Sequence, residues 1–186
     1  MKSLKKTEME LLKRFDFLKE IVEEKVFFIT SQELLDLYPN LSAKEREYEI
    51  TKKHTTVFVK QIGGTLSDGS IHDGRAPDYD DWDLNGDILV YNEVLDCAFE
   101  LSSMGIRVDE NSLVKQLKIR DCEERLELEF HKALISHELP LTIGGGIGQS
   151  RLCMYLLQCA HIGEVQVSSW DLEMIDECKK NGIFLL

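Results

Sequence analysis

The sequence is short of positive charge. Its 186 residues include 22 Lys and Arg against 34 Asp and Glu, which gives a formal net charge of −12. Because proteins that bind nucleic acids neutralise phosphates with Lys and Arg, this balance argues against a nucleic-acid partner. An anionic ligand would need a local cluster of arginines, backbone N–H groups or a divalent cation.

Long apolar runs and paired cysteines are also missing. No stretch approaches the roughly 18 apolar residues of a membrane span, and the basic N-terminal segment has no apolar core of a signal peptide. The five cysteines include no CxxC pair and are odd in number, which argues against a zinc ribbon or a disulfide framework. We therefore expect a cytoplasmic protein with no membrane partner.

The apolar pattern predicts one α+β domain over residues 1–186, because strands and helices alternate without regular βαβ units. An amphipathic helix is predicted over 4–24, the core over 26–168 and a terminal helix over 170–181. Capping boxes at Thr30/Glu33, Ser42/Glu45 and Asp121/Glu124 mark three helix starts. Other helices are expected at 110–118, 122–136 and 149–158, and strands at 26–29, 57–62, 87–91, 97–101, 141–143 and 165–167.

A loop over residues 72–87 concentrates negative charge, with six aspartates between positions 73 and 87. Carboxylates this close together repel one another unless a cation lies among them. A solvated surface loop is one interpretation, although Tyr79 and Trp82 suit a packed loop better. An EF-hand is another, since residues 81, 83, 85 and 86 match its first positions. Asn92 stands where the EF-hand needs a bidentate Glu, and the flanks are not helical.

Two further segments carry candidate ligand-binding groups. Glu100 lies in an otherwise apolar strand with Arg107 seven residues later, a pair suited to Mg²⁺ and nucleotide phosphates. Residues 142–152 read as a strand that enters a glycine-rich turn and opens a helix carrying Arg151, whose guanidinium could stack on a purine. The spacing matches neither GxGxxG nor a P-loop. An edge strand and a tight packing turn are the structural alternatives.

Read together, these segments resemble known enzymes. ELSSMGIRV and GGGIGQSRL resemble two conserved segments of class II aminoacyl-tRNA synthetases. RAPDYDDW, LNGDILV, FELSSMGIRV, RLELEFH and TIGGGIGQSRL, in this order, resemble the aspartate–ammonia ligase family over about residues 27–163. That resemblance implies the synthetase catalytic fold, an antiparallel sheet flanked by helices. It also implies aspartate, ammonia and ATP as substrates, Mg²⁺ as cofactor and a homodimeric enzyme.

The resemblance also implies roles for individual residues. The carboxylates near the acidic loop would hold the amino acid, and the later segments would hold the nucleotide and metal. The catalytic candidates are Asp80, Asp87 and Arg151, and the substrate-binding candidates are Asp80, Asp81, Asp87 and Gly145. The cofactor-binding candidates are Glu100, Ser103, Arg107, Gly146, Gly148 and Arg151, with Glu100 as the metal ligand.

The resemblance implies a two-step reaction, in which aspartate attacks the α-phosphate of ATP and ammonia then displaces AMP. Two departures from the family pattern qualify this expectation. The family carries an additional N-terminal half that this sequence lacks, and the link between DYDDW and LNGDIL is short. A non-catalytic nucleotide- or amino-acid-binding relative, or a fragment that needs a partner, therefore stays open as the alternative. A tRNA-charging enzyme is disfavoured by the negative charge.

Overall fold

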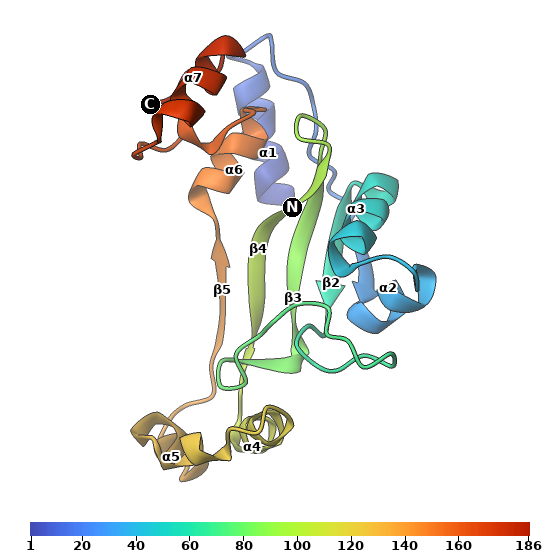
Figure 1. Ribbon diagram of the computed structural model, residues 1–186, viewed down its shortest axis with the longest axis vertical. Coiled ribbons are helices and arrows are strands. Elements are labelled where there is room, and N and C mark those ends of the chain that lie inside the picture. The colour runs from blue at the N-terminus through green and yellow to red at the C-terminus, as the bar shows by residue number, and fades with distance from the viewer.

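A five-stranded sheet forms the centre of the molecule, and the computed structural model describes all of residues 1–186 (Figure 1). The strands lie in sequence order. They are β1 (Phe27–Thr30), β2 (Thr56–Lys60), β3 (Asp80–Asn92), β4 (Cys97–Arg107) and β5 (Ile143–Ile147). The pairs β2–β3, β3–β4 and β4–β5 are antiparallel, whereas β1 runs parallel to β2. The predicted α+β class is confirmed, with a mixed rather than wholly antiparallel sheet.

Helices lie on both faces and at the far end of the sheet (Figure 1). They are α1 (Lys2–Leu12), α2 (Ser31–Leu37), α3 (Ala43–His54), α4 (Glu110–Ile119), α5 (Glu129–Ile135), α6 (Gln149–Leu156) and α7 (Leu172–Lys180), with 3₁₀ turns at Glu123–Glu127 and Ile162–Glu164. The capping boxes predicted for α2 and α3 are both present. No helix combines the length and the apolar composition needed to cross a membrane.

The predicted helix over 4–24 is wrong beyond Leu12, where α1 ends. The buried carboxylate of Glu8 explains the difference, because it accepts the backbone N–H groups of Ile21 and Val22 at 2.6 and 2.8 Å. The chain therefore turns after α1 and returns in an extended form beside it. Val22 is buried by this return and not by a continued helix.

Four other predicted elements differ in the structure. The helix over 122–136 is divided into a 3₁₀ turn and α5, because Leu128 has extended backbone angles and Asp121 makes no capping box. Residues 165–167 form no strand. The terminal helix is α7, slightly shorter than predicted. Most importantly, the glycine-rich segment after Thr142 is a strand and not a turn, since β5 runs through its three consecutive glycines.

Each face of the sheet has its own apolar core. On the face covered by α2 and α3, called here the α3 face, the buried cluster consists of Ile29, Leu34, Ile50, Val57, Val59, Ile62 and Leu89. On the opposite face, called the α6 face, α1 and α6 pack over one end of the sheet, and the buried cluster consists of Val22, Val90, Leu101, Tyr155 and Leu156. Alternation along the strands assigns each side chain to one of these faces.

A β-bulge in β4 decides which side chains share the α3 face. Glu100 and Ser103 are three residues apart, so a regular strand would point them to opposite faces. The pairing of β4 with β3 skips Leu101, and this extra residue restores both side chains to one face. Asp87, which pairs directly with Ser103, lies on that face too. The bulge therefore aligns three polar groups predicted to bind ligands.

Glu8→Ala should destabilise the protein, because it leaves two backbone donors without their acceptor. Each unsatisfied buried group costs about 1–3 kcal/mol, so we expect a loss of about 2 kcal/mol or more in urea denaturation. Glu10→Ala is the matched control, because Glu10 lies on the same helix with an exposed side chain. Equal stability of the two variants would contradict the role given to Glu8.

Candidate functional site

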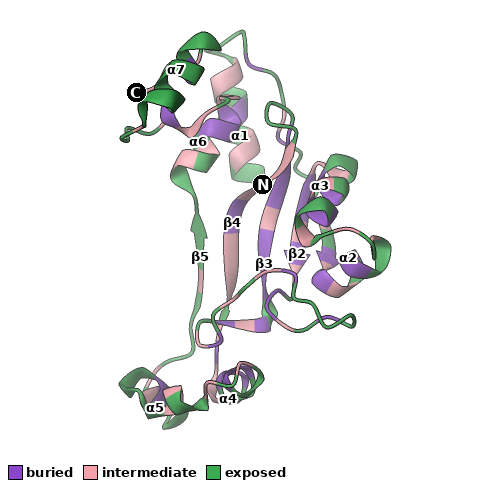
Figure 2. Ribbon diagram, in the orientation of Figure 1, coloured by how far each residue is buried: buried purple, intermediate pink, exposed green.

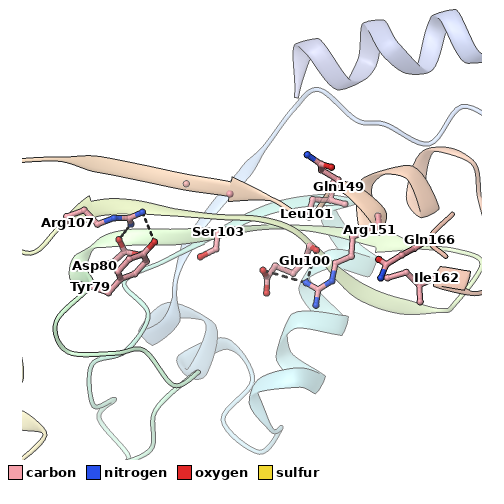
Figure 3. Close-up of a pocket in the computed structure, with 14 residues that line it drawn as sticks. Tyr79, Asp80, Glu100, Leu101, Ser103, Arg107, Gln149, Arg151, Ile162 and Gln166 are labelled. Carbon is pink, nitrogen blue, oxygen red and sulfur yellow. Dashed lines mark hydrogen bonds and ion pairs between the residues drawn. The ribbon is translucent and has the colours of Figure 1, made fainter. Parts of the chain in front are cut away.

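Eight of the ten predicted site residues line one hollow on the α3 face, between β4, β5 and the start of α6 (Figure 3). Its cavity volume is about 490 Å³, which is within the roughly 300–1,000 Å³ of small-ligand sites. These eight residues are Asp80, Glu100, Ser103, Arg107, Gly145, Gly146, Gly148 and Arg151. Groups from positions 80 to 151 thus converge on one space, as the sequence predicted.

One end of the hollow holds a charged pair backed by an aromatic ring. Arg107 Nη1 donates to a carboxylate oxygen of Asp80, and Nη2 donates to the hydroxyl of Tyr79 at 3.0 Å. The guanidinium also lies over the Tyr79 ring, 4.0 Å from its centroid. The register explains the meeting, because Asp80 pairs with Arg107 across β3 and β4. This end therefore presents a carboxylate and a cation side by side.

Two glycines leave room for this pair. A Cβ on Gly105 would lie 2.8 Å from the carboxyl carbon of Asp80, which is closer than real Cβ contacts come. A Cβ on Gly144 would meet the guanidinium of Arg107. Part of the glycine content of these strands is therefore explained by the space that the pair occupies.

The other end of the hollow holds Glu100 and Arg151 (Figure 3). Arg151, in the first turn of α6, donates to the backbone carbonyl of Glu100 at 3.2 Å and lies 3.6 Å from its carboxylate. Both side chains remain partly exposed, so a ligand can reach them. Ser103 lies between this end and Arg107 (Figure 3). The two arginines are therefore placed at opposite ends and not on one phosphate group.

Two of the predicted residues, Asp81 and Asp87, do not line the hollow. The carboxylate of Asp81 accepts the N–H of Asp83 at 2.9 Å. Asp87 is buried beside Ser103 and forms an ion pair with Arg75, while its Oδ1 has no hydrogen-bond partner. Arg75 also bonds Asp73 at 2.7 Å and thus joins the acidic loop to the sheet.

The EF-hand interpretation is wrong. The residues that would form its loop belong to β3, an extended strand from Asp80 to Asn92. Asn85 is buried and exchanges two 2.8 Å hydrogen bonds with the backbone of Ile62. Its side chain is therefore committed to holding β3 and is not available as a calcium ligand.

The sequence did not single out the residues that hold the acidic loop. Gln116 of α4 is buried, accepts the N–H of Trp82 at 2.8 Å and donates to the carbonyls of Pro77 and Asp80 at 2.9 and 3.0 Å. These bonds fix the backbone that presents Asp80 to the hollow. In the sequence, Gln116 is one more residue of a predicted helix. Nothing near it indicates that its hydrogen-bond partners lie 34 or more residues away.

The segment RLELEFH supplies a second anchor for this loop. Arg125 and His131 contact the same carboxylate oxygen of Asp78 at 3.0 and 3.2 Å. Partial burial opposes ionisation, yet these two hydrogen bonds hold the pKa of Asp78 below its usual range. His131 is therefore a buried partner of the loop.

Glu47, His72 and Lys44 form a polar cluster at the start of the loop, in which Glu47 and His72 are buried and Lys44 is exposed. Glu47 of α3 contacts His72 Nε2 at 3.0 Å and Lys44 Nζ at 2.8 Å. Burial alone would raise the pKa of Glu47, but the hydrogen bonds and charges of these partners lower it overall. His72 thus links the start of the acidic loop to α3.

No group of three or more His, Cys, Asp or Glu side chains in the structure could hold a metal ion by itself. Away from the Asp80–Arg107 pair, the side-chain oxygens that line the hollow include the carboxylate of Glu100 and the hydroxyl of Ser103. Mg²⁺ is commonly held by one or two carboxylates together with substrate phosphates and water. The donor set fits a divalent cation that binds together with a phosphorylated ligand.

Comparison with solved structures defines the class. The fold matches the asparaginyl-tRNA synthetase of Entamoeba histolytica with a TM-score of 0.59 and 16% identity, over 89% of this chain and 40% of that one. It also matches the asparaginyl-tRNA synthetase of Pyrococcus horikoshii, solved with asparaginyl-adenylate, with a TM-score of 0.54 and 17% identity over 83% and 38% of the two chains. The chain thus shares the fold of about 40% of the length of these class II aminoacyl-tRNA synthetases.

The family follows from sequence similarity. The family model for aspartate–ammonia ligase matches residues 1–182. The aspartate–ammonia ligase of Clostridium tetani is 61% identical over 185 residues, which are 100% of this chain and 54% of that protein. The chain belongs to the aspartate–ammonia ligase family. It spans about half the length of the curated relatives it matches.

The lowered pKa of Glu47 predicts a pH-dependent contribution to stability. A carboxylate whose pKa falls on folding stabilises the protein above its unfolded pKa, and that stabilisation is lost as pH falls through the folded value. Glu47→Gln should therefore be less stable than the natural protein at pH 7 by about 1–2 kcal/mol, with a smaller gap at pH values well below 4.5, the ordinary pKa of Glu. Urea denaturation measures the gap.

Glu49→Gln serves as the control for Glu47→Gln, because Glu49 lies on the same helix and is exposed. It should match the natural protein at both pH values. A gap for Glu47→Gln that stayed constant with pH would refute the contribution of an ionised Glu47.

Proposed function

We propose that this chain is the ATP- and aspartate-binding part of an aspartate–ammonia ligase, which forms asparagine with release of AMP and pyrophosphate. The observation that supports it is the single hollow that contains Asp80 and Arg107 at one end and Glu100 and Arg151 at the other. Family membership supplies the substrates, and the hollow supplies complementary charges for both of them.

The Asp80 end suits the amino acid. Aspartate carries an ammonium group and two carboxylates, and this end offers a carboxylate next to a guanidinium. Asp80 would take the ammonium in place of part of its contact with Arg107, and Arg107 would then meet a substrate carboxylate. This placement differs from the phosphate role first expected for Arg107, because the structure sets it beside Asp80 and away from Arg151. Asp87 would support this end through Ser103, its neighbour in the sheet.

The Glu100 end suits the nucleotide. The guanidinium of Arg151 is planar and partly exposed, so it can stack on adenine. Gly146 and Gly148 leave the neighbouring wall without side chains, so a flat ligand can approach the backbone. Glu100 and Ser103 would hold Mg²⁺ on the phosphates, where the cation would neutralise charge in phosphoryl transfer. The cation would be needed because the chain has an excess of acidic residues and few Lys or Arg side chains to neutralise the phosphates.

With aspartate at one end of the hollow and ATP at the other, the two reacting groups would meet between the ends. A side-chain carboxylate of aspartate held at Asp80 and Arg107 would face the α-phosphate of a nucleotide held at Arg151. Its oxygen would bond to the α-phosphorus as the bond to pyrophosphate breaks. Ammonia would then attack the resulting acyl carbon, and AMP would leave as the nitrogen loses a proton. The residues contribute mainly position and charge.

The alternative, a binding fragment that needs a partner for turnover, is favoured by one observation. Relatives carry nearly half of their length outside the segment matched here, and that portion could hold further groups needed for catalysis. We therefore separate ligand binding from turnover in the tests.

Asp80→Asn should weaken aspartate binding at least tenfold, about 1.4 kcal/mol, because it removes the negative partner of the substrate ammonium. Calorimetry on the 186-residue protein measures the affinity. Asp83→Asn is the control, since Asp83 pairs with Lys115 on the surface and lies outside the hollow. Unchanged affinity in Asp80→Asn would contradict the proposed amino-acid end.

Arg151→Ala should weaken ATP binding by a comparable factor, because adenine loses its stacking partner. Arg14→Ala controls for loss of one positive charge at an exposed position. In a turnover assay with aspartate, ammonia and ATP, we expect AMP and pyrophosphate. Release of ADP and phosphate would overturn the adenylate mechanism, and binding without turnover would favour the fragment alternative.

A further inference from the structure

The phosphates of a bound nucleotide need positive charge, and the lining of the hollow supplies little of it. Arg107 and Arg151 are the cationic side chains of that lining. Arg107 is paired with Asp80, and Arg151 is the candidate partner of adenine. In the proposed arrangement, the outer phosphates lie beside the carboxylate of Glu100, which carries charge of the same sign. A further cation near this end would relieve that repulsion.

Helix α3 carries a lysine toward this end of the hollow. It packs against β4, the strand that contains Glu100, and Lys44 lies in its first turn. Buried and exposed positions alternate along α3 as the helix turns (Figure 2). Glu47 and Thr51 are buried, and residues three or four apart share one side of a helix. Lys44 therefore starts on the side of α3 that faces the sheet.

Lys44 is nevertheless largely open to solvent. Its side chain is 75% exposed, whereas that of Glu47 one turn later is 8% exposed. The difference shows that the cover over the α3 face ends at this turn. Lys44 Nζ donates to Glu47 Oε2 at 2.8 Å, and this is its one hydrogen bond in the structure. Because an ammonium group has three N–H donors, two remain free for a ligand.

Two carboxylates besides that of Glu47 act on this ammonium group. Desolvation would lower the pKa of the ammonium, but the hydrogen bond to Glu47 and the charges of Asp73 and Glu100 raise it overall. Lys44 is therefore positively charged at neutral pH. Since Glu100 lines the hollow, Lys44 lies within electrostatic reach of the end assigned to the nucleotide.

The geometry of phosphoryl transfer indicates what this cation would meet. In an in-line displacement, the attacking and leaving oxygens lie on opposite sides of the phosphorus atom. Aspartate held at Asp80 and Arg107 would attack from one end of the hollow. Pyrophosphate would therefore leave toward the other end, where Glu100 lies on the face that α3 covers.

We propose that Lys44 binds the β- and γ-phosphates of the nucleotide and stabilises the pyrophosphate that leaves. The inference rests on the proposed function and adds to it a residue outside the lining of the hollow. As a carboxylate oxygen of aspartate bonds to the α-phosphorus, the bond from that phosphorus to pyrophosphate breaks, and its electron pair passes to the leaving oxygen. The ammonium of Lys44 keeps its protons and neutralises part of that charge. Glu47 also contacts His72 at 3.0 Å, so it keeps a partner when the ammonium moves to a phosphate.

The test compares ATP with AMP, because the two share adenosine and the α-phosphate and differ in the outer phosphates. Calorimetry in the presence of Mg²⁺ measures both affinities for the 186-residue protein and its variants. Lys44→Ala should weaken ATP binding by about tenfold or more and leave AMP binding within about twofold. Lys44→Arg should restore most of the ATP affinity, since it restores the charge. Lys53→Ala is the matched control at an exposed lysine in the last turn of α3, and it should change neither affinity.

The ratio of the two affinities separates phosphate binding from a structural role. If Lys44 only held Glu47 in place, Lys44→Ala would lower stability in urea and leave the ratio unchanged, which would overturn the inference. Equal losses for ATP and AMP, or an unchanged ATP affinity, would overturn it too. Lys44→Gln provides the same comparison where Lys44→Ala fails to fold. Failure of the natural protein to bind ATP would refute the proposed function and this inference together, whereas ATP binding that is indifferent to Lys44 would refute this inference alone.

Discussion

The site depends on the antiparallel pairing of β3 with β4 and on the bulge within it. The register sets Asp80 against Arg107 at one end and Asp87 against Ser103 further along. The extra residue at Leu101 then returns Glu100 to the face that carries Ser103. Without that residue, the carboxylate of Glu100 would point to the α6 face. One local irregularity therefore makes a single cavity out of groups that a regular strand would separate.

Charge neutralisation is the second constraint on this strongly acidic chain. The aspartates of the acidic loop do not lie together as one unbalanced cluster. Asp78, Asp80, Asp83 and Asp87 each have a cationic partner, and these partners are Arg125, Arg107, Lys115 and Arg75, respectively. The loop is therefore fixed before any ligand binds, and such prior order reduces the entropy that binding must overcome. A substrate ammonium would replace a cation and would not have to neutralise an open patch.

The two faces of β5 carry different side chains. One face borders the hollow between β4, β5 and α6, where Gly144 permits the close approach of Arg107. The other face carries Ile143 and Ile147 into solvent. This division explains why a segment rich in glycine still contains large apolar residues at both ends. Alternation along the strand directs Gly144 and Gly146 to one face of the sheet and Ile143 and Ile147 to the other.

Local signals in the sequence determined the elements whose stabilisation is local. The capping boxes of α2 and α3, the α+β class and the convergence of Asp80, Glu100, Arg107 and Arg151 all follow from motifs read along the chain, because each depends on residue types at short spacing or on family resemblance. Tertiary structure alone decided the rest. Glu8 ends α1 through backbone groups 13 and 14 residues away, and Gln116 fixes the loop from 34 or more residues away. The bulge at Leu101 depends on the register with β3. Such contacts join residues that are far apart in the sequence. Local composition and periodicity therefore cannot reveal the free energy that these contacts contribute.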